Sequence, residues 1–228
     1  MPEDLGTDRK VVKMTHFANA ARFQPLREVD GYWEAIRGGR LVPRRSDVNP
    51  RGIERALEFA FIAERIAPGL GRVRIAGSHL TELMGMEVRG MPVTTFFTAA
   101  ARAQVGEALE EVCTGPAKAE LLLTGETGFG KPPLEARMLL LPLKSDLGDI
   151  SRVLGCLVTL GGIGRAPRRF DVSEVVMRPL LKDDVVIDDG PIAPARHRPE
   201  PVGLSEAPAR FEPGPAPYLR LVKTDHSE

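Results

Sequence analysis

The first clear pattern of apolar positions along the chain predicts a helix near the N-terminus. The segment PLREVDGYWEAIRGG, residues 25 to 39, carries an apolar residue at every third or fourth position: Leu26, Val29, Trp33 and Ile36. This spacing places all of them on one stripe of a helix, and the glycine pair ends the pattern. Because such a short helix is marginal alone, we expect it to pack on the following domain as an N-terminal cap.

Alternation of apolar and polar positions then predicts two strands. The segment IERALEFAFIAERI, residues 53 to 66, begins with helical spacing and favours a strand from about Glu58. The segment RVRIAG, residues 72 to 77, alternates Val73 and Ile75 with arginines, as a half-buried strand does. The two segments therefore predict one strand each, joined by a tight turn.

Helical patterns occupy the middle of the chain. SHLTELMG, residues 78 to 85, predicts a short helix with Ser78 as its N-cap and Gly85 at its end. A longer helix is expected over residues 96 to 113, with Phe97 on its apolar face. Three strands should follow with short loops, at residues 117–125, 133–143 and 151–162. Strands at both ends with helices between them predict an α+β domain with one five-stranded antiparallel sheet and its helices on one face.

Proline marks the C-terminal part of the chain. Ten of the 20 prolines fall between residues 165 and 228, and each proline removes a backbone donor and fixes φ. We therefore expect an extended, largely disordered tail, interrupted by two apolar pieces at residues 170–181 and 218–222 that could dock on the domain or on a partner. The expected organisation is a flexible N-terminus (1–22), the cap helix with a basic linker (23–54), the domain (55–164) and the proline-rich tail (165–228).

Composition and charge narrow the class of protein. The 228 residues are 43% hydrophobic and 27% charged, with a formal net charge of zero, so no global field attracts nucleic acid or an anionic membrane. Neither a secretory signal nor a membrane-spanning segment is visible. The two cysteines, Cys113 and Cys156, lie far apart and offer no zinc cage or disulfide framework. A cytoplasmic protein that binds neither nucleic acid nor membrane is the expectation.

Two segments carry a resemblance to a known family. YWEAIRGGRLVPRRSDVNP (32–50) followed by RVRIAGSHLTELMGMEVRGM (72–91) resembles the compact PAS-type proteins common in alphaproteobacteria. The motif consists of four residues around a short apolar helix: Arg74, Gly77, Gly85 and Gly90. The resemblance covers about residues 25 to 163. It implies a PAS fold, in which a five-stranded sheet holds small helices and one connecting helix.

One glycine-rich segment imitates a nucleotide-binding loop. GETGFGKP matches G-x-x-x-x-G-K with Gly125, Gly130 and Lys131, but Pro132 stands where Ser or Thr would hold magnesium. The segment after it alternates like a strand, so no helix is expected there to present its N-terminal amides to a phosphate. We therefore predict a hairpin turn at this position and no nucleotide hydrolysis.

Cofactor and catalytic signals are few. The resemblance implies an Asn-Cys-Arg motif in flavin-binding relatives and a histidine on the long helix in haem-binding relatives, and neither occurs here. His79 and Glu82 form an i, i+3 pair. Two ligands are too few for a metal site, and this pair is the only candidate for acid–base catalysis. No enzyme activity and no metal are expected. The cofactor stays unknown.

Candidate binding residues fall into two groups. An apolar pocket between the small helices and the sheet would be lined by His79, Met84, Met86, Phe97 and Met138, although these residues also suit ordinary core packing. The cap helix and the basic linker supply candidate interaction residues: Tyr32, Trp33, Arg37, Arg40, Arg44 and Arg45. The linker arginines either hold an anionic partner through phosphate or carboxylate contacts or form a solvated connection.

These observations favour a stand-alone PAS-type sensory or protein-interaction module in bacterial signal transduction. The resemblance implies a signalling-protein partner or a homodimer, formed through the sheet face or the cap helix, and a small-molecule ligand that biases this contact. Two alternatives stay open. One is a constitutive adaptor with a closed core and no ligand, and the other is a small-molecule enzyme that uses His79 and Glu82.

Overall fold

The structure is a computed structural model that describes residues 22–180. In chain order its elements are the helix α2 (Gln24–Arg37), the 3-10 helices η1 (Arg45–Asp47) and η2 (Pro50–Phe59), the strands β1 (Ala60–Ala67) and β2 (Leu70–Ala76), the helix α3 (Ser78–Met84), the 3-10 helix η3 (Val93–Phe96), the helix α4 (Arg102–Thr114), and the strands β3 (Ala117–Gly125), β4 (Glu135–Lys144), β5 (Ile150–Leu160) and β6 (Phe170–Pro179). The predictions for residues 1–21 and for residues 181–228, including the apolar piece at 218–222, lie outside these residues.

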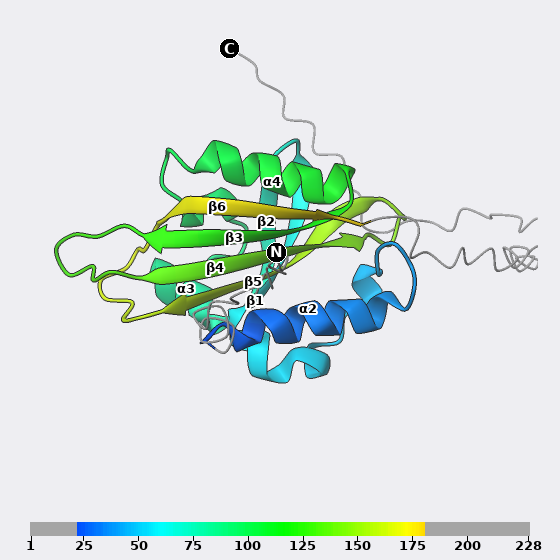
Figure 1. The fold of residues 1–228 in the computed structure, drawn as a ribbon, viewed down its shortest axis with the longest axis horizontal. Coiled ribbons are helices and arrows are strands. Elements are labelled where there is room, and N and C mark those ends of the chain that lie inside the picture. The colour runs from blue at the N-terminus through cyan, green and yellow to red at the C-terminus, as the bar shows by residue number, and fades with distance from the viewer. Residues whose placement is uncertain (1–21, 181–228) are drawn as a thin grey trace, which may run out of the picture. The chain divides into compact units, whose positions relative to one another are not determined.

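All strands join one antiparallel sheet in the order β2-β1-β5-β4-β3-β6 (Figure 1). The five predicted strands are present, and β3 has the predicted bounds. The sixth strand corrects two expectations, because β6 lies in the segment assigned to the disordered tail. It pairs with β3 from Ala117↔Pro179 to Gly125↔Phe170, and Phe170 is fully buried. Its proline lies at the last strand position, where a missing backbone donor does not interrupt the ladder.

Apolar side chains cover both faces of the sheet, which corrects the prediction of helices on one face. Strand β4 is buried at six consecutive positions and β5 at six, so each face needs a cover. On one face, α3, η3 and α4 enclose the larger core cluster. On the other face, α2 and η2 enclose a second cluster. Figure 1 shows α2 and α4 on opposite sides of the central strands.

The cap helix α2 is an integral part of the second cluster. Trp33 is fully buried, and its indole Nε1 donates a hydrogen bond to the Pro142 carbonyl oxygen at 2.9 Å. The Lys118 ammonium lies 4.9 Å from the centre of the indole ring and 2.6 Å from an Asp30 carboxylate oxygen. The predicted docking of the cap helix onto the domain is therefore confirmed, and it buries the only tryptophan of the chain.

The connection between the two helices of the first face differs from the prediction. Helix α4 begins at Arg102 and not near residue 96, because η3 and an extended stretch precede it. Phe97 lies in that stretch and forms a bridge with Phe170, and the Thr98 amide donates to the Phe170 carbonyl at 3.0 Å. Phe96 and Phe97 are both buried. Phe96 ends η3 and Phe97 has extended backbone, with φ -120° and ψ 152°.

The turns agree with the sequence-based predictions more closely than the start of α4 does. Gly85 has φ +70° and its amide donates to the Thr81 carbonyl at 2.8 Å, so it ends α3 as predicted. The N-cap of α3 is Gly77 and not Ser78. The glycine-rich segment forms the β3–β4 hairpin, with a bridge between Gly128 and Lys131, so the hairpin prediction is confirmed.

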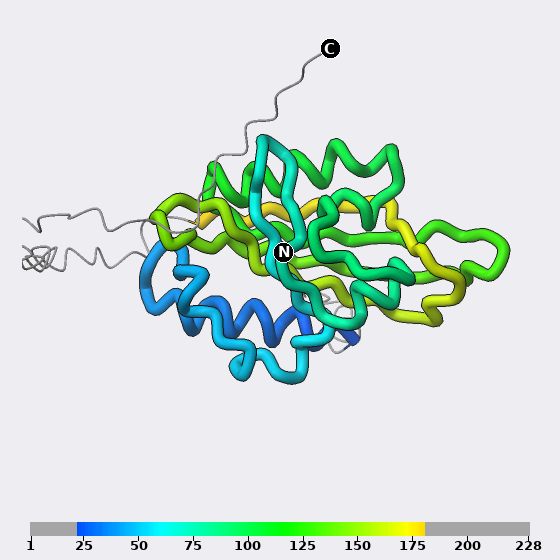
Figure 2. The backbone as a smooth tube through the Cα atoms, turned by 180° about the vertical axis from the view of Figure 1, so that it is seen from behind, coloured from blue at the N-terminus to red at the C-terminus, as the bar shows by residue number. Residues whose placement is uncertain are grey.

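The β1–β2 hairpin is tied to helix α4. Arg65 of β1 forms two hydrogen bonds with the Glu110 carboxylate, at 2.7 and 2.5 Å, and the Gly69 amide donates to the same carboxylate at 2.8 Å. Figure 2, seen from behind, shows this hairpin in cyan running toward α4. Within residues 22–180, no helix is long and apolar enough to cross a membrane.

Candidate binding groove

Side chains fill the interior in which a ligand pocket was predicted. Met84 is 4% exposed, and Phe97 and Met138 are fully buried in the larger core cluster. Met86 follows Gly85 at the end of α3 and is 52% exposed. The structure therefore brings three of the five predicted lining residues together as packed core, and the assignment of all five to a ligand stays a prediction.

His79 is a buried residue with a structural partner. Its Nε2 lies 3.1 Å from the Thr159 hydroxyl, and the Phe59 ring packs edge-on with the ring centres 4.9 Å apart. Burial lowers the pKa of His79, although the nearby carboxylates of Glu82 and Glu58 oppose that shift. The hydrogen-bond partner of His79 is thus a strand residue and not Glu82. Across residues 22–180, no group of three or more His, Cys, Asp and Glu side chains is arranged to hold a metal ion.

Both cysteines are buried. Burial raises the pKa of the Cys113 thiol to about 11, against a smaller opposing effect of Arg65. Burial raises the pKa of the Cys156 thiol as well. Reactive thiols need a thiolate and solvent access, so the surroundings of both residues are those of structural cysteines.

An open groove lies on the other face, between η2 and the edge of the sheet formed by β1 and β2. Its volume is about 610 Å³, within the range of roughly 300–1,000 Å³ that is typical of ligand sites. Two large aliphatic side chains stand in its walls: Leu57 is 43% exposed and Ile75 is 48% exposed. The remaining lining residues are Arg45, Val48, Pro50, Ile53, Glu54, Glu58, Ala60, Phe61, Ile62, Ala76, Gly77, Ser78 and Leu154.

The walls of the groove are held together at Gly77. The Gly77 amide donates to the Ala60 carbonyl at 2.8 Å. A Cβ atom at Gly77 would lie 2.1 Å from the Glu58 carbonyl oxygen, so no larger residue allows this approach of η2 to the end of β2. The predicted motif glycine thus positions the groove.

A polar hollow adjoins the groove. It has a volume of about 380 Å³ and shares Arg45, Ile62 and Ile75 with the groove. Its other lining residues are polar: Ser46, Arg74, Ser145, Asp146 and Arg152. The two hollows therefore form a continuous site with an apolar part and a part rich in guanidinium groups.

Glu64 holds two of the arginines of the polar hollow. Its carboxylate lies 2.7 Å from an Arg152 nitrogen and also pairs with Arg74. Burial alone would raise the pKa of Glu64, but hydrogen bonds and charge attraction from the two guanidinium groups lower it. Glu64 is thus ionised at neutral pH and neutralises part of their charge.

The predicted interaction residues are spread over different environments. Trp33 is buried, and the Tyr32 hydroxyl accepts the Asn49 amide at 2.6 Å. Arg37 pairs with Glu34 and Arg40 pairs with Asp47, each at 2.8 Å. These contacts give the basic linker an internal structure.

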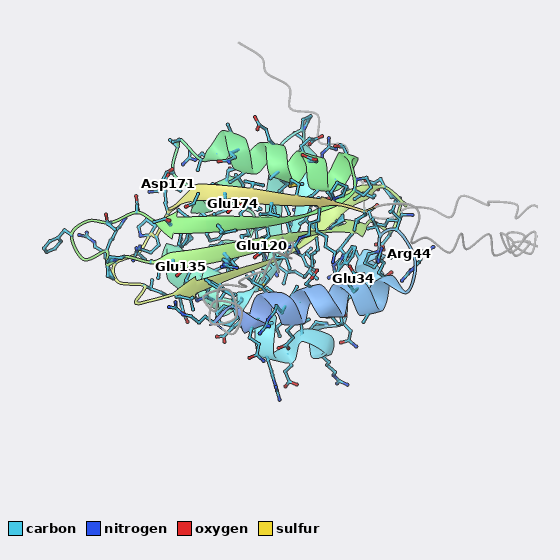
Figure 3. All side chains as sticks on the ribbon, in the orientation of Figure 1. Glu34, Arg44, Glu120, Glu135, Asp171 and Glu174 are labelled. Carbon is cyan, nitrogen blue, oxygen red and sulfur yellow. The ribbon has the colours of Figure 1, made fainter. Side chains whose placement is uncertain are left out.

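Arg44 and Arg45 complete this set. Arg44 is exposed and is labelled in Figure 3 beyond the end of α2. Arg45 lines both the groove and the polar hollow. Of the six predicted interaction residues, Arg45 is the one that belongs to the groove.

Sequence reasoning missed the two exposed aliphatic residues of the groove. The alternation of apolar and polar positions in β2 predicts the same environment for Ile75 as for Val73, but Val73 is fully buried and Ile75 is not. A register shift in the β1–β2 pairing between Ile62 and Ala63 separates their environments, as a β-bulge does. A bulge leaves no trace in the alternation of β2 itself, so no signal in that strand identified Ile75.

Comparison with known proteins identifies the family. The family model described as "PAS domain" matches residues 21–158. No curated protein matches the chain. Among solved structures, the light-state LOV domain of the blue-light photoreceptor Aureochrome1 is similar at 13% identity and a TM-score of 0.36, over 49% of this chain and 88% of that one.

A second solved structure, a light-oxygen-voltage domain studied with a flavin analogue, is similar at 16% identity and a TM-score of 0.35, over 49% of this chain and 83% of that one. At these scores neither similarity bears on function. The family match rests on the sequence and spans more than half of the 228 residues. The chain therefore belongs to the PAS domain family.

Proposed function

We propose that this chain is a PAS-type sensory and protein-interaction module of bacterial signal transduction, and that an apolar segment of a signalling partner binds the groove between η2 and the β1–β2 edge. The observation that carries the proposal is the contrast between the two faces of the sheet. The core beneath α3 and α4 is filled by its own side chains, whereas the groove presents Leu57 and Ile75 to solvent.

The two aliphatic walls supply the driving force for binding. Fully burying one such side chain contributes about 1.5–3 kcal/mol, and Leu57 and Ile75 still have nearly half of that burial to gain. Hydrophobic grooves of this kind accept an apolar stripe of a partner helix or alternate residues of a strand. A partner that covers both residues therefore gains binding free energy without any rearrangement of the core.

The filled core also supports the adaptor alternative over a sensor with a ligand inside the fold. PAS domains are typically sensory modules and not enzymes, and the contact of His79 with Thr159 gives the acid–base alternative no support. The homodimer stays a prediction, as does the cytoplasmic location.

Site-specific photo-crosslinking in the cells that naturally produce the chain tests the proposed interface. A benzophenone amino acid replaces Ile75, which is 48% exposed, and the matched control carries it at Met86, which is 52% exposed. We expect a discrete cross-linked partner from position 75 and none from position 86. A Leu57→Glu substitution in the same chain should abolish the product. Equal labelling from both positions, or a product that survives Leu57→Glu, would contradict the proposed interface.

A further inference from the structure

We infer that the groove and the adjoining polar hollow together bind an amphipathic carboxylate, of the fatty-acid class, with its aliphatic chain against Leu57 and Ile75 and its carboxylate at Arg45. This inference adds a small-molecule ligand to the proposed protein-interaction site. It does not require that a partner protein be present, because it rests on the described side chains of the two hollows alone.

The apolar part fits an aliphatic chain. The walls combine the buried residues Ile53 and Leu154 with the exposed Leu57 and Ile75. The groove volume of about 610 Å³ suits a molecule of small-ligand size. Because the groove opens at the surface, such a chain enters without displacing any core residue, unlike a ligand placed beneath α3 and α4.

Arg45 is the residue that selects an anion. Within residues 22–180 its guanidinium takes part in none of the ion pairs, whereas Arg37 and Arg40 of the same segment are paired. Arg45 lines both hollows, so it stands where the apolar part meets the polar part. A guanidinium presents paired donors that match the two oxygens of a carboxylate.

The charges around the polar hollow favour one orientation. Arg74 and Arg152 pair with Glu64, and Asp149 bonds to Ser145 beside Arg152, whereas the guanidinium of Arg45 has no carboxylate among its ion-pair partners within residues 22–180. The groove itself also contains carboxylates, since Glu54 and Glu58 line it.

These carboxylates repel an anionic head group from the apolar part of the site. The same negative charges leave the aliphatic chain unaffected. Charge therefore directs the head group of the ligand to the polar hollow and its chain to the groove.

Occupation by such a ligand would compete with a protein partner for Leu57 and Ile75. A ligand shifts an equilibrium only through different affinities for the two states. The ligand and the partner need the same apolar walls, so the ligand binds the free chain and not the chain whose groove holds the partner. The competition turns the interaction module into a sensor of amphipathic anions.

Isothermal titration calorimetry of the full chain with decanoate, near neutral pH and below its micelle concentration, tests the inference. We expect saturable binding, and weaker binding of decanol, which has the same chain without the charge. Arg45→Gln should weaken decanoate binding by roughly 10- to 100-fold, the effect of losing a hydrogen bond to a charged group. The matched control Arg44→Gln changes an exposed neighbouring arginine outside both hollows and should leave binding unchanged. Ile75→Glu should abolish it.

Three results would overturn the inference: no saturable binding of decanoate to the wild-type chain, equal affinities for decanoate and decanol, or the same affinity in Arg45→Gln and Arg44→Gln. The first two need no variant, so they hold even if a substitution disturbs folding. Each of these failures leaves the cross-linking result at Ile75 unaffected. Conversely, decanoate binding without any cross-linked partner would support the small-molecule site and contradict the protein interface.

Discussion

Replacement of Trp33 should destabilise the whole domain, because the cap helix shares its core with the central strands. The indole is fully buried and donates its N–H to the Pro142 carbonyl, 109 residues away in the sequence. Two substitutions separate the contributions. Trp33→Phe keeps an aromatic ring and removes the donor, whereas Trp33→Ala removes the ring as well.

The expected magnitudes follow from these contacts. Trp33→Ala should lower the free energy of unfolding by about 3–5 kcal/mol, the range for large-to-small changes in a core. Trp33→Phe should lower it by about 1–3 kcal/mol, because the buried Pro142 carbonyl loses its hydrogen-bond donor. Since domains are typically stable by about 5–15 kcal/mol, the alanine variant loses a large share of its stability.

Urea unfolding followed by far-ultraviolet circular dichroism measures both changes without relying on tryptophan fluorescence. At a slope of about 1–3 kcal/mol per molar urea, the midpoint of Trp33→Ala should fall by roughly 1–5 M. Arg27→Ala, an exposed change on the same helix, serves as the control and should stay within about 0.5 kcal/mol of the wild type. If both Trp33 variants matched this control, α2 would not belong to the core.

Two further predictions concern buried polar residues. Arg168 is fully buried and its guanidinium donates to three backbone carbonyls. Arg168→Met should therefore lower the free energy of unfolding, measured in urea, by about 3 kcal/mol. A decrease as small as that of the control Arg165→Met, at an exposed position, would refute this prediction. Burial lowers the pKa of the His79 imidazole below its usual 6.5 in the folded state. The imidazole therefore binds a proton more readily in the unfolded chain, and the folded state loses stability as the pH falls below about 6.5. His79→Gln should therefore lose less unfolding free energy than the wild type between about pH 7 and about pH 5.5; equal losses would contradict the proposed burial effect.

Local patterns predicted most of the elements, because an apolar stripe or an alternation shows which positions of an element are buried before its partner in the fold is known. The cap helix has an apolar stripe that ends at a glycine pair, and α2 indeed ends at Arg37. The strand at Ala117–Gly125 alternates cleanly and begins just after a glycine and proline. In both cases the side-chain period and the residues that end the element agree, so sequence reasoning had two independent signals.

Long-range pairing accounts for what was missed. Strand β6 alternates weakly and ends in a proline, and its place in the sheet depends on β3, whose partner residues lie about 45 or more positions earlier. The groove depends on which side chains remain uncovered, and Ile75 and Val73 carry the same local pattern. Arg45 was predicted because the sequence has a local run of arginines. That it forms no ion pair within residues 22–180 could not be predicted, because this depends on where Glu34 and Asp47 lie in the fold.

Strand β6 also determines where the C-terminal boundary of an expressed domain should lie. The family match ends at residue 158, before Phe170 enters the core and before β6 covers the outer ladder of β3. A fragment trimmed to the matched region would leave a cavity in place of the Phe170 ring. It would also make β3 an exposed edge strand with unpaired backbone amides, and such edge strands pair readily with other molecules. Expression of an isolated domain should therefore include the residues through Pro179.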